Sequence, residues 1–249
     1  MKTTNILGVE VACVGLLDIL SCVGHLRTIG GRRAVFYVNA HCINTACDDA
    51  EYQQILNQGD LVYCDGMGVV WASNMLGGCR LEKNTGADWI FPFCEYAEHE
   101  GISLYLLGGK PGVAKTVRQN LLNTYTTLKI VGVSDGYFIE NSEQVVLNDI
   151  KVLHPDVVLV GMGSPVQEKW ISRHRAEILA PVCWGVGALF DYVAEIEPRA
   201  PSWMDAAGLE WLWRLIINPS GKWKRYLLGN PVFVYRVLMA SFRLRRLGR

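Results

Sequence analysis

The 249-residue sequence has few features of a membrane-spanning, repetitive or disordered protein. No segment provides the roughly 20 uninterrupted apolar residues that a spanning helix needs, because the most apolar late window, 226–242, contains Asn230, Pro231 and Arg236. The N-terminus has no basic segment followed by an apolar run, so no signal peptide is expected. No sequence pattern recurs at a fixed period, which argues against a solenoid or propeller. Half of the residues are apolar, which suits a large globular core.

Several catalytic patterns are also missing. The five histidines show neither HxH nor HxxxH spacing, and no Asp-x-Asp pair follows a predicted strand, so no metal and no cofactor are expected. The absence of Gly-x-Ser-x-Gly argues against a serine hydrolase. The eight cysteines form no CxxC motif and several lie in apolar runs. We therefore expect reduced core cysteines in a cytosolic protein, rather than disulfides or a zinc site.

Acidic residues are scarce at one end of the chain, although the formal net charge is zero. Residues 1–198 contain 14 Lys and Arg against 22 Asp and Glu, whereas residues 199–249 contain 10 against only Asp205 and Glu210. Such a basic end favours a ligand with phosphates or an anionic membrane surface, with a merely solvated tail as the alternative. No nucleic-acid-binding module is recognisable, so nucleic acid is not expected as a partner.

Short apolar runs alternate with segments of helical periodicity. This alternation predicts an α/β protein with a mainly parallel, Rossmann-like sheet flanked by helices over residues 1–198. The strands are expected at 34–39, 60–65, 102–107, 128–133, 156–160 and 182–186, and the helices at 41–57, 66–77, 86–99, 112–124, 142–153 and 165–179.

A different composition begins after Pro198. Residues 199–249 are rich in tryptophan and basic residues, and we expect a helical appendage outside the sheet. Asn230 and Pro231 predict an N-cap and a first helical position, followed by a basic amphipathic helix over 232–247.

Polar side chains at the carboxyl ends of the predicted strands are the candidate site residues, because ligands bind at that edge of open α/β sheets. Asp65 lies between an apolar strand and Gly66, and it is either a general base or the cap of the next helix. Asn39 ends the preceding strand, where it either orients a hydroxyl or forms a turn. Gln167 is a candidate ligand contact, whereas Glu168 and Asp191 are either ligand contacts or helix-capping acids.

Glycines also follow the strands. Gly108 and Gly109 precede a helix, and Gly163 and Gly187 follow later strands. Such loops either make tight turns or present N–H groups to a phosphate, and their recurrence favours a nucleotide or sugar-nucleotide site.

Taken together, the motifs resemble the bacterial N-acetylmannosaminyltransferase family of glycosyltransferases, the WecG/TagA/CpsF group. The resemblance covers roughly residues 5–230. It rests on VNAH at 38–41, DGMG at 65–68, TGAD at 85–88, LLGGKPGV at 106–113, the segment 132–138 ending in GYF, GMGSPVQE at 161–168, GVG at 185–187 with Phe190 and Asp191, RAPSW at 199–203 and GLEWLWR at 208–214.

The resemblance implies an inverting, metal-independent transfer from a UDP-sugar to a polyprenyl-diphosphate-linked sugar, by a peripheral protein on the cytoplasmic face of the bacterial plasma membrane. It implies Asp65 as the general base, with Asn39 and Gln167 in the same pocket. The residues that it places around the substrates are Lys83, Gly108, Gly109, Gly136, Tyr137, Gly163, Glu168, Gly187, Asp191, Arg199, Arg214 and Arg225. It also suggests a homo-oligomer.

The sequence departs from the family pattern near the predicted site. Tyr37 replaces a common threonine, and Lys83 replaces a common arginine. These changes leave the donor sugar open, as N-acetylmannosamine or another hexose. A non-catalytic UDP-sugar-binding protein and an enzyme that modifies sugar nucleotides remain the alternatives.

Overall fold

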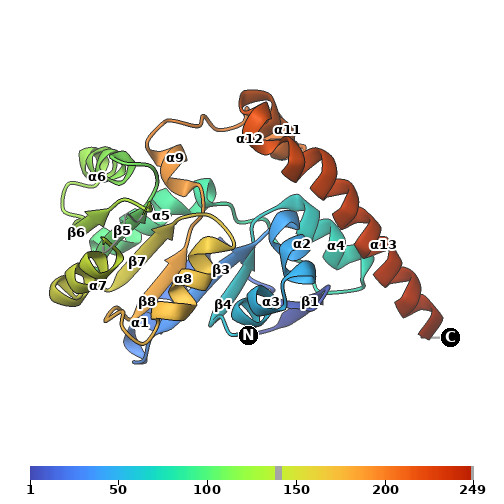
Figure 1. Cartoon of the computed structure of the whole chain (residues 1–249), viewed down its shortest axis with the longest axis horizontal. Helices are drawn as coiled ribbons and strands as arrows, with labels where there is room; N and C mark the ends of the chain where they lie inside the picture. The colour runs from blue at the N-terminus through green and yellow to red at the C-terminus, as the bar shows by residue number, and fades with distance from the viewer. Residues whose placement is uncertain (138–141, 248–249) are drawn as a thin grey trace.

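Six of the short apolar segments form one parallel sheet in the computed structural model, which describes residues 1–137 and 142–247 (Figure 1). The strand order is β4-β3-β8-β7-β5-β6, and every neighbouring pair is parallel. The strands are β3 (Arg33–Val38), β4 (Leu61–Cys64), β5 (Ser103–Gly108), β6 (Lys129–Ser134), β7 (Val157–Gly161) and β8 (Val182–Gly185). The predicted Rossmann-like sheet is confirmed. Two residues named in the sequence analysis or counted in its charge balance, Phe138 and Arg249, lie outside the described residues.

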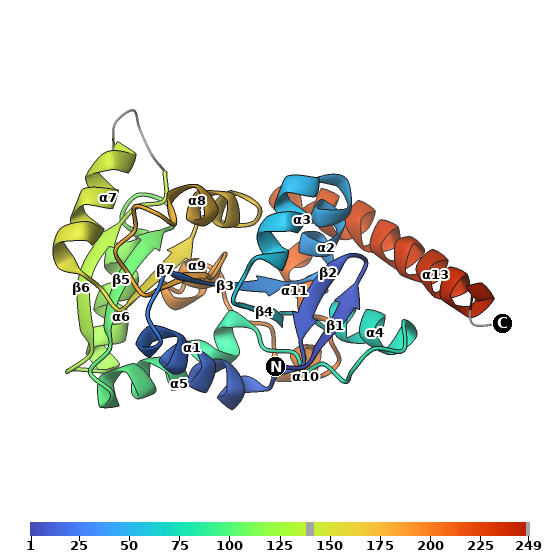
Figure 2. The ribbon, with the colours of Figure 1, turned by 90° about the horizontal axis from the view of Figure 1, so that it is seen from below.

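Helices cover both faces of the sheet, as Figure 2 shows for α1 and α5 on one side and α3, α7 and α8 on the other. Neighbouring strand residues such as Val35 and Phe36 enter different hydrophobic clusters, because side chains alternate along a strand. One cluster includes α1 (Leu16–Thr28), α5 (Gly86–His99), α6 (Val113–Thr124) and α9 (Leu189–Val193); the other includes α2 (Ala40–Asp48), α3 (Ala50–Asn57), α4 (Met67–Met75), α7 (Ser142–Leu153) and α8 (Val166–His174).

Two predicted helices differ from those observed. The segment 41–57 is divided into α2 and α3, because Asp49 has an extended backbone and its side chain accepts a hydrogen bond from the Tyr52 N–H, which caps α3. The segment 165–179 is helical only to His174 as α8.

The N-terminal region contains structure that the sequence analysis missed. A separate hairpin joins β1 (Thr3–Ile6) to β2 (Val9–Ala12) through Leu7 and Gly8, whose φ angles of 51° and 94° suit a two-residue turn. Helix α1 follows this hairpin and was also missed.

The segment after residue 198 adds helices but no strand to the described structure. They are α10 (Ser202–Ala206), α11 (Glu210–Ile217), α12 (Pro219–Trp223), a π-helical turn η1 (Lys224–Leu228) and α13 (Gly229–Leu247). Helix α13 packs against α2 and α4 and buries Phe233, Val237 and Ser241 at helical spacing.

The predicted helix start at Asn230 is wrong, because α13 begins at Gly229 and directly continues η1. Pro231 has no N–H for the carbonyl of Leu227, which disrupts the regular hydrogen-bond ladder where the π turn occurs. No helix in residues 1–137 or 142–247 combines the length and apolar character needed to cross a membrane.

The expectation that all cysteines are reduced is also wrong. Cys13, which follows β2, forms a disulfide with Cys79 in the loop between α4 and α5, with the two Cα atoms 6.4 Å apart. The pair was missed because its sequence separation of 66 gives no sign of the contact between the hairpin and this loop.

We predict that Cys13→Ser lowers the free energy of unfolding by about 2–4 kcal/mol under non-reducing conditions, because the disulfide restricts the unfolded chain. Urea denaturation with and without reductant measures the change. Thiol labelling of the unfolded wild-type protein should detect two additional cysteines after reduction. Equal labelling before and after reduction would contradict the disulfide.

Candidate active site

Asp65 and Asn39 lie next to each other at the carboxyl edge of the sheet. Val38 and Cys64 are paired in the parallel ladder, so the residues that follow them emerge together. The Asn39 Oδ1 accepts hydrogen bonds from the N–H groups of His41 and Cys42, while its Nδ2 donates to Asp65 Oδ2 over 3.2 Å. Asp65 makes no cap hydrogen bond to α4. Its carboxylate is therefore available for chemistry.

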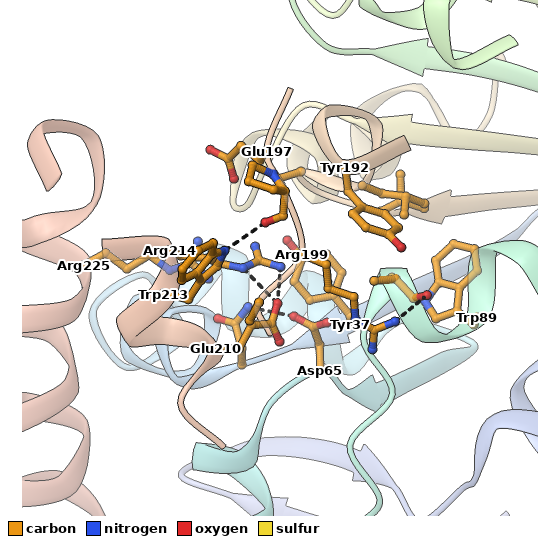
Figure 3. Close-up of a pocket in the computed structure, with 18 of the residues that line it drawn as sticks. Tyr37, Asp65, Trp89, Tyr192, Glu197, Arg199, Glu210, Trp213, Arg214 and Arg225 are labelled. Atoms are coloured by element: carbon orange, nitrogen blue, oxygen red, sulfur yellow. Dashed lines mark hydrogen bonds and ion pairs between the residues drawn. The ribbon is translucent and has the colours of Figure 1, made fainter. Parts of the chain in front are cut away.

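Two cavities meet at Asp65. The first lies above the sheet edge beneath residues 197–200, and aromatic side chains line much of it: Tyr37, Tyr63, Trp89, Tyr192 and Trp213 (Figure 3). The second has a volume of about 420 Å³ and lies between α2, α4 and the C-terminal helices. Both cavities share Asn39, Asp65, Glu210, Arg214 and Arg225. The structure thus brings together four of the candidate site residues: Asn39, Asp65, Arg214 and Arg225.

Burial raises the pKa of the Asp65 carboxyl from 3.8 to about 7. The nearby Arg214 guanidinium lowers this pKa, the Glu210 carboxylate raises it, and the Asn39 hydrogen bond and Arg225 lower it. The group therefore gains and loses a proton near neutral pH, which suits a general base.

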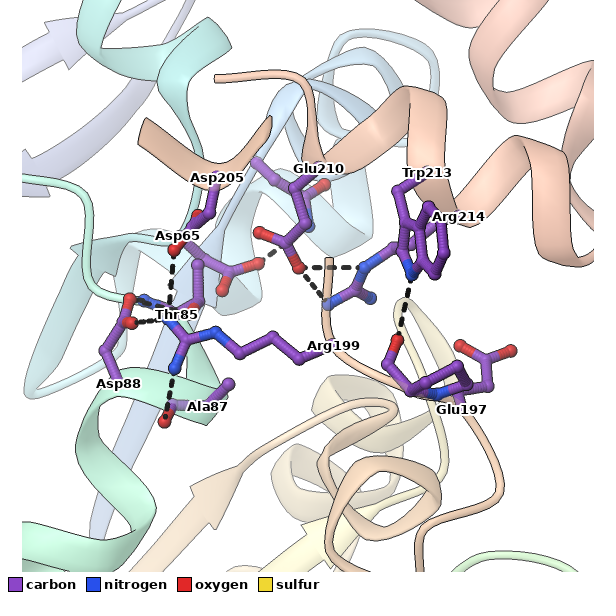
Figure 4. Close-up of polar contacts among 12 residues, drawn as sticks. Asp65, Thr85, Ala87, Asp88, Glu197, Arg199, Asp205, Glu210, Trp213 and Arg214 are labelled. Atoms are coloured by element: carbon purple, nitrogen blue, oxygen red, sulfur yellow. Dashed lines mark hydrogen bonds and ion pairs between the residues drawn. The ribbon is translucent and has the colours of Figure 1, made fainter. Parts of the chain in front are cut away.

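Most cations around the cavities are paired with carboxylates (Figure 4). Arg214 donates from Nε and Nη2 to Glu210 Oε1, over 2.9 and 2.5 Å. Asp205 accepts from both Lys83 and Arg199, and Arg199 also pairs with Asp88.

Arg225 differs from these cations. Its guanidinium lies 5.5 Å from the centre of the Tyr226 ring, and no ion pair joins it to an acid in the described parts of the chain. Arg225 borders both cavities and can therefore bind an anion without first breaking an ion pair with a carboxylate.

Gln167 and Glu168 lie behind the cavity wall rather than on it. Gln167 Oε1 accepts from the Gly187 N–H over 2.9 Å, and its Nε2 donates to Glu168 Oε1 over 2.8 Å. Ser164 joins Glu168 to Tyr37 in the same network. Burial raises the pKa of Glu168 to about 6. In this structure Gln167 supports the Gly187 loop, and its direct contact with a ligand stays a prediction.

Close backbone packing accounts for several strand-end glycines. A Cβ at Gly108 would lie 2.4 Å from the Gly161 oxygen, and one at Gly136 would lie 2.9 Å from the Gly108 Cα. The N–H groups of Gly109 and Gly136 already donate to the carbonyls of Gly161 and Gly109. A phosphate at these loops would therefore need other donors.

The remaining candidates lie around the site rather than in it. Gly108, Gly109, Gly136, Tyr137 and Gly163 line neither of the two cavities, and Tyr137 is two-thirds exposed.

Two further candidates belong to the β8–α9 region. The turn at Gly187, with φ 59°, lies against the Tyr37 hydroxyl. Asp191 is half-buried on α9. The binding roles of both residues stay predictions.

The sequence analysis missed several cavity residues. These residues lining the cavities are Trp71, Glu210, Trp211, Trp213 and Phe233. The only signals in the sequence were the many aromatic residues and the presence of an acid, Glu210, in a basic segment. Within the described ranges, no group of three or more His, Cys, Asp and Glu side chains is arranged to hold a metal ion.

We predict that Asp65→Asn raises the free energy of unfolding at pH 8 by on the order of 1–3 kcal/mol, because the partly buried Asp65 carboxylate is desolvated when ionised. A folded-state pKa above 3.8 means that this group's contribution to stability is lost as the pH rises from about 4 towards 7. The gain should disappear at pH 4, which urea denaturation at both pH values tests. An equal difference at pH 4 and pH 8 would argue against a raised pKa.

Comparison with known proteins agrees with the geometry. A model of the glycosyl transferase WecG/TagA/CpsF family matches residues 4–247. The chain is 34% identical over 201 residues to the N-acetylglucosaminyldiphosphoundecaprenol N-acetyl-β-D-mannosaminyltransferase of Bacillus subtilis (strain 168), covering 81% of this chain and 77% of the relative. It is 27% identical over 246 residues to the transferase of the same name from Staphylococcus aureus (strain NCTC 8325 / PS 47), covering 97% and 94%. The chain therefore belongs to the WecG/TagA/CpsF family of glycosyltransferases.

Proposed function

We propose that this protein transfers a hexose, such as N-acetylmannosamine, from a UDP-sugar to a hydroxyl of a polyprenyl-diphosphate-linked sugar. The observation that carries the proposal is the position of Asp65 where two cavities meet, with Arg214 and Arg225 bordering both. A transferase needs this arrangement because its base must reach an acceptor while cations face the phosphates of the substrates. The names of both relatives describe a transfer to a sugar-diphosphoundecaprenol.

Asp65 acts as the general base in one displacement step. Its carboxylate takes the proton of the acceptor hydroxyl as the hydroxyl oxygen bonds to the anomeric carbon of the donor. The bond from that carbon to the phosphate oxygen breaks, and UDP leaves with the electron pair. Arg214 and Arg225 stabilise the charge that develops on the leaving diphosphate. Asn39 holds Asp65 in place through its Nδ2 donor.

The second cavity fits the acceptor. Met67, Trp71, Phe233 and Val234 give it apolar walls, while Arg225 borders the same space. Apolar walls suit the first isoprene units, and the cation suits the diphosphate. The first cavity lies at the strand ends where α/β sheets bind nucleotides, and its volume of about 70 Å³ suits only the reacting end of the donor.

We infer that the C-terminal segment docks on a membrane surface next to the second cavity. Leu228, Tyr235 and Phe242 on η1 and α13 are 56%, 64% and 60% exposed, and Arg243 and Arg246 are exposed nearby. Apolar side chains together with basic ones favour binding to anionic lipid, at about 1 kcal/mol for each basic residue. Residues 1–198 would then form the catalytic domain, and 199–249 would form an appendage docked on the cytoplasmic face of the membrane.

We predict acceptor-dependent UDP release by the purified protein for one member of a panel of UDP-sugars. The acceptor is a short polyprenyl diphosphate carrying N-acetylglucosamine, and release should persist in EDTA. Asp65→Asn should lower the rate at least 100-fold because the base is lost. Asp48→Asn removes a carboxylate outside both cavities and serves as the control. Wild-type rates in Asp65→Asn would refute Asp65 as the base.

We predict that the double variant Leu228→Glu and Phe242→Glu binds vesicles containing phosphatidylglycerol at least tenfold more weakly, because two apolar contacts become charged. Co-sedimentation measures this binding, and UDP binding checks that the fold is retained. Leu17→Glu alters an even more exposed leucine on α1, at 77%, and should leave vesicle binding unchanged. Unchanged sedimentation of the double variant would exclude this surface as the docking face.

A further inference from the structure

The two acidic residues of the segment 199–249 both line the second cavity. Among residues 199–249, Asp205 and Glu210 are the only acidic residues. Asp205 is shared between Lys83 and Arg199, whereas Glu210 borders Asp65 in both cavities (Figure 4). A second carboxylate beside a buried carboxylate is electrostatically unfavourable, so its presence calls for a function.

Glu210 restrains the guanidinium of Arg214. The two residues lie one turn apart on α11, and Arg214 donates from both Nε and Nη2 to the same oxygen of Glu210, Oε1. Arg214 thereby uses Nε and one N–H of Nη2, and no acceptor in the described part of the chain bonds to Nη1. One edge of the guanidinium is therefore held, while the other is available for a phosphate.

Glu210 also competes with Asp65 for Arg214. Glu210, Arg214 and Arg225 are the charged groups that act most strongly on Asp65. Asp65 also acts electrostatically on Arg214, so it would be left to interact with the guanidinium if Glu210 lost its charge. An aspartate paired with arginine is a weaker base, because the pair favours the charged carboxylate.

The tyrosines and the histidine around Asp65 are neutral near pH 7, and the lysine there is already paired. Burial raises the pKa values of Tyr37, Tyr63 and Tyr226, so these phenols keep their protons. Burial lowers the pKa of His41 to about 4, so its ring is uncharged near neutral pH. Lys83 is engaged by Asp205. Glu210 is therefore the negatively charged group that acts most strongly on the pKa of Asp65.

We infer that Glu210 is a positioning residue for the transfer, which holds Arg214 towards the substrate phosphates and keeps it from neutralising Asp65. This inference rests on the proposed function, in which Asp65 is the base. It assigns to the C-terminal segment a part in tuning the base as well as in binding.

The test is the pH profile of kcat/KM for the wild type, Glu210→Gln and Glu210→Asp. In the wild type, the acidic limb should have a midpoint near pH 7, where Asp65 titrates. Glu210→Gln should move this midpoint down by about one pH unit, because a neighbouring negative charge is removed. It should also lower the plateau rate about 10- to 100-fold, because Arg214 is no longer held. Glu210→Asp should keep the midpoint but lose rate, because the charge remains on a shorter side chain.

Asp48→Asn, which breaks the ion pair with Arg236 outside the cleft, is the matched control and should retain the wild-type profile. A wild-type midpoint and rate in Glu210→Gln, with Asp65→Asn inactive, would overturn this inference alone. Activity that does not depend on Asp65 would instead overturn the proposed function. Thermal melting of each variant separates a loss of rate from a loss of fold.

Discussion

Burial of the Asp65 carboxyl group is the constraint on which the site depends. An aspartate at an open strand end would ionise near pH 4 and would be a weak base at neutral pH. The C-terminal helices close over the sheet edge and bring Glu210, Arg214 and Arg225 around this group. Desolvation and Glu210 favour its protonated form, whereas both arginines and Asn39 favour the charged form. Their balance makes the carboxyl group reactive near neutral pH.

The same closure produces two chemically different cavities. One is bounded by the sheet edge and aromatic rings, and the other by the apolar faces of α4 and α13. Asp65 and the two arginines border both cavities, so in the proposed reaction a hydroxyl from one side would meet an activated sugar from the other. Helix α13 has a buried stripe through Phe233 and Val237, while its opposite face is exposed and apolar. The helix that lines the second cavity therefore also carries an exposed apolar surface of the kind that suits lipid.

The sequence predicted the parts of the fold that depend on local patterns. Apolar strands separated by amphipathic helices identify a parallel sheet, and strand ends identify Asp65 and Asn39 as neighbours. The hairpin at residues 3–12 was missed because its short strands contain exposed polar residues, and so lack the continuous apolar run that marks the strands of the sheet. The Cys13–Cys79 disulfide depends on a contact between distant segments, which spacing does not encode. The position of the Glu210–Arg214 pair beside Asp65 likewise depends on how the C-terminal segment folds over the sheet edge.

The glycine loops show why composition alone left two interpretations open. Glycines 108, 136 and 161 permit close contact between neighbouring loops, and this packing fixes the sheet edge on which the site is built. Gln167 and Glu168 have a related position, because they connect the Gly187 loop to Tyr37 from behind. A motif shared by a family can therefore include residues that shape the site without lining it.

The most direct test of this account is the titration of Asp65 itself. Carbon-13 NMR of protein labelled at the aspartate carboxyl carbons, with Asp65→Asn to assign the signal, reports its protonation without substrate or turnover. The account predicts a midpoint near pH 7 for this carboxyl. A midpoint near pH 4, the value of a solvated aspartate, would contradict a buried base at this position.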